Sequence, residues 1–262
     1  MFVGAQFIRY AVQIAWALPI VLALELMWPL ERQSWLSRLR GAAMWSLYIL
    51  FSAAILTLGD VAMRVLGIRP LFNNAPTIVA ALLAIILADF FYYWSHRAQH
   101  RWFWRFHAVH HSIRELSAVN SYHHWTEELI RIPLVNVPVL LLAPPSARAP
   151  AIGLLVVLQT YYLHASTGLH FGPLRRIIAD NRYHRIHHSM QNGHFDRNFA
   201  ATFPVWDVLF GTVHWPSRDE WPATGVRDVA EPDGAADYLL GPFLGGKLPH
   251  LDLAADGERA CD

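Results

Sequence analysis

The stretch His96-Arg-Ala-Gln-His100-Arg-Trp-Phe-Trp-Arg-Phe-His107-Ala-Val-His110-His111 places five histidines close together in the chain. Residues three or four apart project from one face of a helix, and at about 100° per residue these five fall within an arc of roughly 100° if the helix is unbroken. The spacing therefore predicts a single stripe of imidazoles. Neutral imidazole is the commonest side-chain ligand for metals, so the stripe indicates a metal site.

The same spacing returns further along the chain, in His184-Arg-Ile-His187-His188. Twelve of the fifteen histidines lie between His96 and His188. A lone histidine is ordinarily a surface residue, but burying this many imidazoles without partners would cost about 1–3 kcal/mol each, more in total than the net stability of a typical domain. We therefore expect the histidine-bearing faces to enclose two metal ions.

Composition indicates a membrane protein. Hydrophobic residues make up 54% of the 262 residues, charged residues 16%, and the mean hydropathy is +0.25, which is more apolar than a soluble domain usually is. Apolar runs at 7–30, 42–58 and 77–94 each approach the ~20 residues that a helix needs to cross the hydrocarbon core, and predict three spans. Two shorter runs, 130–143 and 152–164, flank a proline-rich link and predict a helical hairpin.

Arginines set the expected orientation, because positive charge favours the cytoplasmic side. They concentrate between the first and second spans and again directly after the third. The first set is Arg32, Arg38 and Arg40, and the second is Arg97, Arg101, Arg105 and Arg114. The predicted fold is all-α: an integral, multi-pass membrane helical bundle whose cytoplasmic, histidine-rich helical cap holds a dinuclear metal site.

We predict three regions in the chain. Residues 1–76 form the N-terminal transmembrane helices and their links, and residues 77–214 combine the third span, the hairpin and the histidine motifs. Residues 215–262 are rich in proline, glycine and aspartate, which predicts a cytoplasmic tail that is partly ordered at best.

Charge and cysteine content exclude several classes of function. A net charge of +1 without a basic stripe gives no footprint for nucleic acid, which we exclude as a partner. Cys261 is the only cysteine, so the sequence offers neither an intrachain disulfide nor cysteine ligands for zinc or an iron–sulfur cluster. Any metal must be held by nitrogen and oxygen.

Asp89 lies inside the third predicted span, where a carboxylate costs about 2.5–3.5 kcal/mol on insertion scales. It precedes His96 by two helical turns, so it could orient a metal-bound imidazole through the second ring nitrogen. The alternative is that Asp89 lies near the membrane interface and is hydrated. The sequence leaves both interpretations open.

Three parts of the chain together resemble the fatty acid hydroxylase and sterol desaturase superfamily. The first is Asp89-Phe-Phe-Tyr-Tyr-Trp-Ser-His96-Arg-Ala-Gln-His100, and the second is the pair of His-x-x-His-His motifs. The third is the closing Asn198-Phe-Ala with Trp206-Asp207-Val-Leu-Phe210-Gly211-Thr212. The resemblance covers residues 89–212, about half of the chain.

The resemblance implies a membrane oxygenase with a non-haem di-iron centre. It also brings in His164, which ends the helix before the last motif, and His124 with Glu127, although Tyr122 and Trp125 depart from the arginine and proline of the family pattern. Asp89, Glu127 and Asn198 are the implied residues for orienting ligands or holding water. The implied metal ligands are His96, His100, His107, His110, His111, His124, His164, His184, His187 and His188.

The remaining histidines receive an ordinary interpretation as surface or loop residues. They are His123, His170, His194, His214 and His250, and we predict that none of them binds metal.

The expected reaction is the hydroxylation or desaturation of a C–H bond of a lipid, a sterol, fatty acid or related isoprenoid, with dioxygen and two iron ions. An imidazole shell also suits zinc, which can take the place of iron. No dinucleotide-binding fingerprint is present, so electrons must come from a separate reductase, ferredoxin or b-type cytochrome. Arg97, Arg101 and Arg105 are candidates for docking such an acidic partner.

Two other classes of function stay open. A membrane metal transporter or store would distribute its ligands along the spans, whereas here all but Asp89 lie outside them. A zinc-dependent membrane hydrolase would use a glutamate to activate water, but the His-Glu-x-x-His motif is absent.

Overall fold

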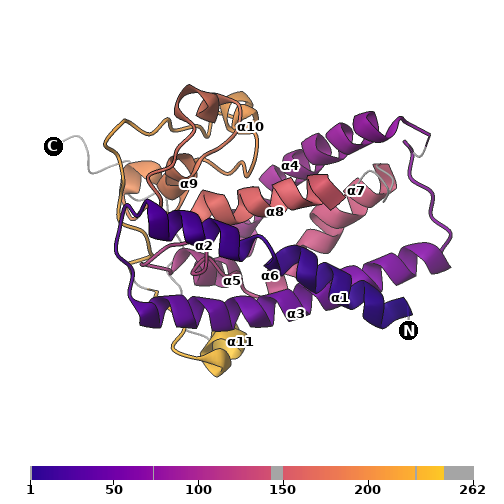
Figure 1. Cartoon of the computed structure of the whole chain (residues 1–262), viewed down its shortest axis with the longest axis horizontal. Coiled ribbons are helices and arrows are strands. Elements are labelled where there is room, and N and C mark those ends of the chain that lie inside the picture. Colours follow the sequence, from indigo (N-terminus) through magenta and orange to yellow (C-terminus); the bar gives the residue numbers. More distant parts are fainter. Residues whose placement is uncertain (1, 73, 143–149, 228, 245–262) are drawn as a thin grey trace.

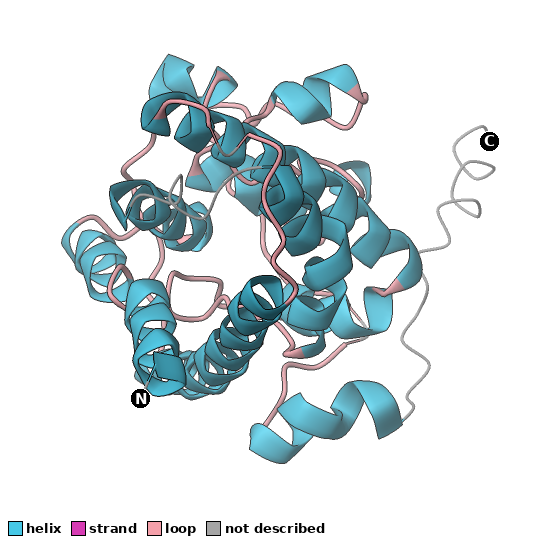
Figure 2. Cartoon of the chain, turned by 90° about the vertical axis from the view of Figure 1, so that its right-hand side faces the viewer, coloured by secondary structure: helices cyan, strands magenta, loops and turns pink. Residues whose placement is uncertain are grey.

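The computed structural model describes residues 2–72, 74–142, 150–227 and 229–244. Within these residues every regular element is a helix, and β-structure is limited to three isolated bridges. Figure 2, coloured by secondary structure, shows helices joined by loops throughout the described chain. The all-α prediction is confirmed for this part of the protein.

Two helices contain predicted spans and are long and apolar enough to cross a membrane. They are α3 (Trp35–Val65), which contains 42–58, and α4 (Thr77–Trp102), which contains 77–94. Ser34 starts α3, because its hydroxyl accepts a hydrogen bond from the backbone N–H of Ser37 at 3.2 Å.

The prediction of one continuous span over residues 7–30 is wrong. The chain forms α1 (Phe2–Ala15) and α2 (Leu18–Met27), separated at Trp16 and Ala17. Pro19 lies in the first turn of α2, where its missing N–H would have no helical partner in any case. At 1.5 Å per residue each helix is shorter than the ~30 Å hydrocarbon core.

The predicted hairpin has two arms. The first arm consists of α6 (Thr126–Arg131), a π-helix (Ile132–Asn136) and α7 (Val137–Leu142), and the second is α8 (Pro150–His164). Residues 143–149 at the predicted tip lie outside the described residues.

The histidine-bearing elements gather at the end of the molecule where α4 and α8 finish (Figure 1). They are α5 (Trp104–His111) and α9 (Asn181–His187), with the 3-10 helices Gly172–Arg176 and Asn192–His194 and α10 (Val205–Leu209) completing this end. The condition for a single stripe, an unbroken helix from His96 to His111, is not met, since Phe103 leaves helical geometry with φ −120° and ψ 21°.

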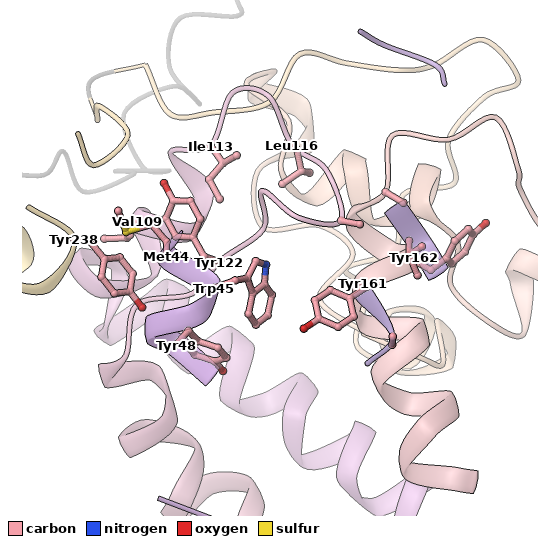
Figure 3. Packing of buried hydrophobic residues seen from close by; sticks show 14 residues of the cluster. Met44, Trp45, Tyr48, Val109, Ile113, Leu116, Tyr122, Tyr161, Tyr162 and Tyr238 are labelled. Carbon is pink, nitrogen blue, oxygen red and sulfur yellow. The ribbon is translucent and has the colours of Figure 1, made fainter. Parts of the chain in front are cut away.

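An aromatic core joins the three predicted regions (Figure 3). Trp45 of α3 packs against Tyr161 of α8 with ring centroids 5.1 Å apart. From the C-terminal region, α11 (Ala235–Leu244) contributes Tyr238, which is fully buried and donates a hydrogen bond to the carbonyl of His123 at 2.6 Å. The predicted tail is thus folded over residues 235–244, while residues 245–262 lie outside the described chain.

Gly41 fixes the distance between α3 and the buried segment that follows α5. A Cβ atom at this position would lie 2.8 Å from the Cα atom of Asn120, closer than real Cβ contacts. Because the two nearest atoms, from Val119 and Asn120, belong to the backbone, they cannot rotate away. The close approach of the two segments therefore requires glycine.

We predict that Gly41→Ala lowers the free energy of unfolding by about 1–3 kcal/mol through overpacking. Gly59→Ala on the same helix is the matched control, because a Cβ there meets open space and should stabilise α3 by up to about 1 kcal/mol. Denaturant unfolding in detergent micelles measures both variants. Equal stability of the two would contradict the close approach.

Candidate metal centre

Nine histidines from four parts of the chain converge in two adjacent groups. The candidate ligand atoms within each group lie within 4.8 Å of one another. Group A consists of His96, His100, His107, His111 and His187, and group B consists of His110, His164, His184 and His188. The ring centroids of His111 in group A and His188 in group B are 4.5 Å apart, so the groups are in contact.

Each of the two His-x-x-His-His motifs supplies histidines to both groups, and the second motif reverses the assignment of the first. In α5 the first and last histidines belong to group A and His110 belongs to group B. At α9 the first and last belong to group B and His187 belongs to group A. Residues four apart on a helix share a face, while the residue between them points to one side, so each motif serves both groups.

The outer ring nitrogens are held by acceptors. Nδ1 of His96 lies 2.8 Å from the carbonyl oxygen of Phe199, and Nδ1 of His187 lies 2.8 Å from that of Arg197. In group B, Nδ1 of His110 lies 3.1 Å from the carbonyl oxygen of Tyr122. A carbonyl oxygen can only accept, so Nδ1 carries the proton of each neutral ring and Nε2 presents a lone pair.

These lone pairs face one another. In group A the Nε2 atoms of His96 and His107 are 3.0 Å apart, and in group B those of His110 and His164, whose Nδ1 atoms both lie on carbonyl oxygens, are 3.2 Å apart. Buried Nε2 of His187 has no hydrogen-bond partner at all. Two lone pairs at this distance repel unless a cation lies between them, and ligands at about 2.1 Å from one ion are separated by roughly 3.0–3.4 Å. The donor sets therefore fit a metal ion in each group.

Burial keeps the rings neutral, as metal ligation requires. Desolvation, reinforced by the neighbouring imidazoles, holds the pKa of His107, His111 and His187 well below the ordinary value of 6.5. The same causes lower the pKa of His184 and His188 in group B.

Carboxylates support group A. Glu127, fully buried, places Oε2 3.2 Å from Nδ1 of His107, and Asp196 places Oδ1 3.0 Å from Nδ1 of His100. In the described chain no carboxylate oxygen lies within hydrogen-bond distance of a group B ring. Such partners raise the basicity of a ligating imidazole, so the two groups differ electronically.

The sequence did not predict the role of Asp196. Its contact with His100 depends on the conformation of the loop, and no residue spacing in the sequence indicates that conformation. Asp196 has φ 53° and Asn198 has φ 57°, both in the left-handed region.

The sequence also did not predict the role of His123. It is buried, its Nδ1 lies 3.0 Å from Glu127 Oε2, and its ring stacks on His110 at 3.8 Å. The i, i+4 spacing of His123 and Glu127 could have revealed it.

The structure gives Asp89 a different role from both interpretations of the sequence. Asp89 is buried, so it is not hydrated at an interface, and none of its hydrogen bonds within the described chain is to an imidazole. Its carboxylate accepts hydrogen bonds from the backbone N–H groups of Thr202 and Phe203, both at 2.8 Å, and from the indole of Trp206 at 3.0 Å. Asp89 therefore anchors the start of α10 to α4.

Two further predicted residues lie outside groups A and B. The amide of Asn198 donates to the carbonyls of Tyr183 and His214, both at 2.8 Å, which fixes the loop after α9. His124 bonds to the hydroxyl of Thr126 at 2.6 Å and stacks on Phe106. Neither one contacts a member of the two groups in the described hydrogen bonds.

A cavity of about 390 Å³ opens beside group A. His100 and Asp196 lie on its wall with Arg97, Arg101, Trp94 and Trp104. The cavity gives access from the outside to His100, a group A imidazole.

Comparison with known proteins agrees with this geometry. The sequence profile described as fatty acid hydroxylase matches residues 81–212, about half of the chain. The chain belongs to the fatty acid hydroxylase family. The matched residues include all nine histidines of groups A and B, both arms of the hairpin, and Asp89 with Trp206. The resemblance predicted from the sequence is confirmed.

Similar proteins include a lipid hydroxylase, a monooxygenase and an aldehyde decarbonylase. The chain is 32% identical over 172 residues to an ornithine lipid hydroxylase of Rhizobium tropici, covering 64% of the chain and 51% of the relative. It is 29% identical over 131 residues to the alkylglycerol monooxygenase of Homo sapiens, covering 49% and 29%. A very-long-chain aldehyde decarbonylase of Oryza sativa subsp. indica is 28% identical over 190 residues, covering 67% and 29%.

The match thus spans about half or less of the length of these relatives. No solved structure matches the chain significantly.

The lowered pKa values predict how the stability of the metal-free protein depends on pH. Below about pH 6.5 histidines of the unfolded chain take up protons, whereas the buried rings of the folded protein stay neutral. Because the unfolded state binds more protons, the free energy of unfolding falls as the pH decreases, by up to about 1.4 kcal/mol per pH unit for each such histidine.

Denaturant unfolding of chelator-treated protein between about pH 8 and pH 5 measures this dependence. Stability should be constant above about pH 7 and decline below about pH 6.5. Stability that stays level to about pH 5 would mean that the rings are not buried in the neutral form.

Proposed function

We propose that this protein is a membrane-bound, non-haem di-iron oxygenase that hydroxylates a lipid, with one iron ion in group A and one in group B. The observation that carries the proposal is the pair of buried imidazole lone pairs that face one another in each group, at 3.0 Å between His96 and His107 in group A and at 3.2 Å between His110 and His164 in group B. Nine nitrogen donors from distant parts of the chain converge, and no lysine or arginine of the described residues is hydrogen-bonded to them. The relatives' names agree with a lipid substrate.

The protein residues would orient and protect the ions. Carbonyl acceptors at Nδ1 hold His96, His110, His164 and His187 in one tautomer. Glu127 and Asp196 would make their imidazoles stronger donors in group A. When bound, the iron pair supplies dioxygen activation and removal of hydrogen from an unactivated C–H bond. The balance is R–H + O₂ + 2e⁻ + 2H⁺ → R–OH + H₂O, so two electrons must be delivered in each turnover.

We propose hydroxylation in preference to desaturation because two of the three relatives are named as a hydroxylase and a monooxygenase. Both are named for polar lipids, so a polar lipid is the proposed substrate class. Helices α3 and α4 would hold the enzyme in the bilayer, with the metal centre at the cytoplasmic end where Arg97, Arg101 and Arg105 lie.

We propose that a separate acidic protein delivers the electrons at these arginines. Arg101 and Arg105 are exposed, and Arg97 and Arg101 line the cavity that reaches His100. Complementary charge speeds such encounters and makes them dependent on ionic strength.

We predict that Glu127→Gln weakens the binding of one metal ion per chain by about 10–100-fold, the usual effect of losing an outer partner of a ligand. The affinity of group B for its metal ion should be unchanged. Metal content after dialysis against graded chelator concentrations measures the change. Glu128→Gln is the matched control, because Glu128 lies next in the same helix but bonds to Arg131 and Tyr48 instead of histidines.

The main test combines metal analysis with product analysis. Purified protein should contain two irons per chain, and cells expressing it should accumulate a lipid one oxygen heavier, labelled from ¹⁸O₂. His107→Ala and His184→Ala should each abolish the product, whereas His170→Ala at an exposed loop position should not. Charge reversal of Arg97, Arg101 and Arg105 should slow reduction of the centre by the donor, and Arg69→Glu should not.

Zinc in place of iron, with no oxygen-dependent product, would refute the proposal and favour the hydrolase class. A lipid lacking two hydrogens would replace hydroxylation with desaturation. If the rate of reduction by the donor were unchanged after the charge reversal, the proposed docking site would be refuted, but the oxygenase proposal would not.

A further inference from the structure

A second histidine cluster lies outside groups A and B. It consists of His194, His214 and Glu220, whose candidate ligand atoms lie within 4.8 Å of one another. Nε2 of His194 is 3.0 Å from Oε1 of Glu220, and Nε2 of His214 is 3.3 Å from the same oxygen. The three residues come from the 3-10 helix Asn192–His194, the chain after α10 and a loop of the C-terminal region.

Other atoms of these three residues make hydrogen bonds that fix the side chains in place. Nδ1 of His194 lies 2.9 Å from the hydroxyl of Ser189, and the second carboxylate oxygen of Glu220 accepts from the backbone N–H of Ser217 at 2.8 Å. The backbone N–H of His214 donates to the amide oxygen of Asn198 at 2.7 Å. The two Nε2 atoms and Oε1 are therefore held in one small volume before any ligand arrives.

This donor set has the chemistry of a zinc site. Two imidazole nitrogens and one carboxylate oxygen suit Zn²⁺, and ligands at about 2.0–2.1 Å in tetrahedral geometry lie roughly 3.3 Å apart, close to the spacing observed. His194 is buried, whereas the side chain of His214 is 32% exposed and that of Glu220 is 21% exposed. Water can therefore reach the fourth position.

We propose that His194, His214 and Glu220 bind a zinc ion that is separate from the dinuclear centre. The site would have a structural role, because it ties the loop after α9 to the C-terminal region. That loop supplies three of the outer partners of group A: the Asp196 carboxylate and the carbonyls of Arg197 and Phe199. It also holds Asp196 and Asn198 at positive φ, which a cross-link nearby would help to maintain.

The competing explanation is a purely hydrogen-bonded cluster in which both imidazoles donate to Glu220. The experiment must therefore count metal. Protein with its dinuclear centre loaded is dialysed against buffered zinc, and zinc and iron per chain are measured for the wild type, Glu220→Gln and His214→Ala. The expected result is one more zinc per chain in the wild type than in either variant, with iron unchanged.

Two further measurements locate the ion. His170→Ala, an exposed histidine outside every cluster, should retain the additional zinc. Cobalt substitution should produce a tetrahedral visible spectrum that Glu220→Gln loses, and zinc should slow amide hydrogen exchange in residues 192–199 of the wild type alone.

Equal zinc content in the wild type and Glu220→Gln, or a cobalt spectrum that survives both substitutions, would overturn the proposal and leave the hydrogen-bonded cluster. Because the count is a difference between variants, this outcome is independent of which metal occupies groups A and B. Failure of the oxygenase proposal would likewise leave the zinc difference intact.

Discussion

A neutral imidazole has one proton and one lone pair, and this limit governs the histidine-rich end of the molecule. Where Nδ1–H donates to a backbone carbonyl, as in His96 to Phe199 and His110 to Tyr122, the inner nitrogen Nε2 has no proton to donate. Several such nitrogens meet in one buried volume. Their mutual repulsion can be relieved by a cation, so the fold of this region and metal binding are coupled.

The rest of the structure serves to hold these rings at that distance. Asp207 is fully buried and accepts from the backbone N–H groups of Phe199 and Ala200, both at 2.9 Å, and from the phenol of Tyr183 at 2.8 Å. Together with Asp89 it makes the Trp206-Asp207 motif a structural one. These carboxylates fix the backbone that in turn orients the imidazoles. They therefore act on the metal centre indirectly, through the backbone, and within the described chain they make no hydrogen bond to the ligands themselves.

The two groups are unequal. Group A has five imidazoles, two carboxylate partners and an approach from the outside through His100, whereas group B has four imidazoles, of which His184 and His188 have buried Nδ1 atoms without partners. An ion supported by carboxylates is expected to be bound more firmly and to be harder to reduce. The asymmetry suits a centre in which one ion is reached first by reactants and the other is held deep among α5, α8 and α9.

The sequence by itself determined the chemistry. Residues three and four apart share a helical face in any helix, so the spacing in 107–111 and 184–188 predicted imidazole clusters, and the composition predicted apolar helices before any packing was known. Tertiary structure decided the rest. The crosswise sharing of ligands, the break at Phe103, the anchoring role of Asp89 and the pairing of Asp196 with His100 all depend on where segments far apart in the chain meet, and local spacing carries no information about contacts across such distances.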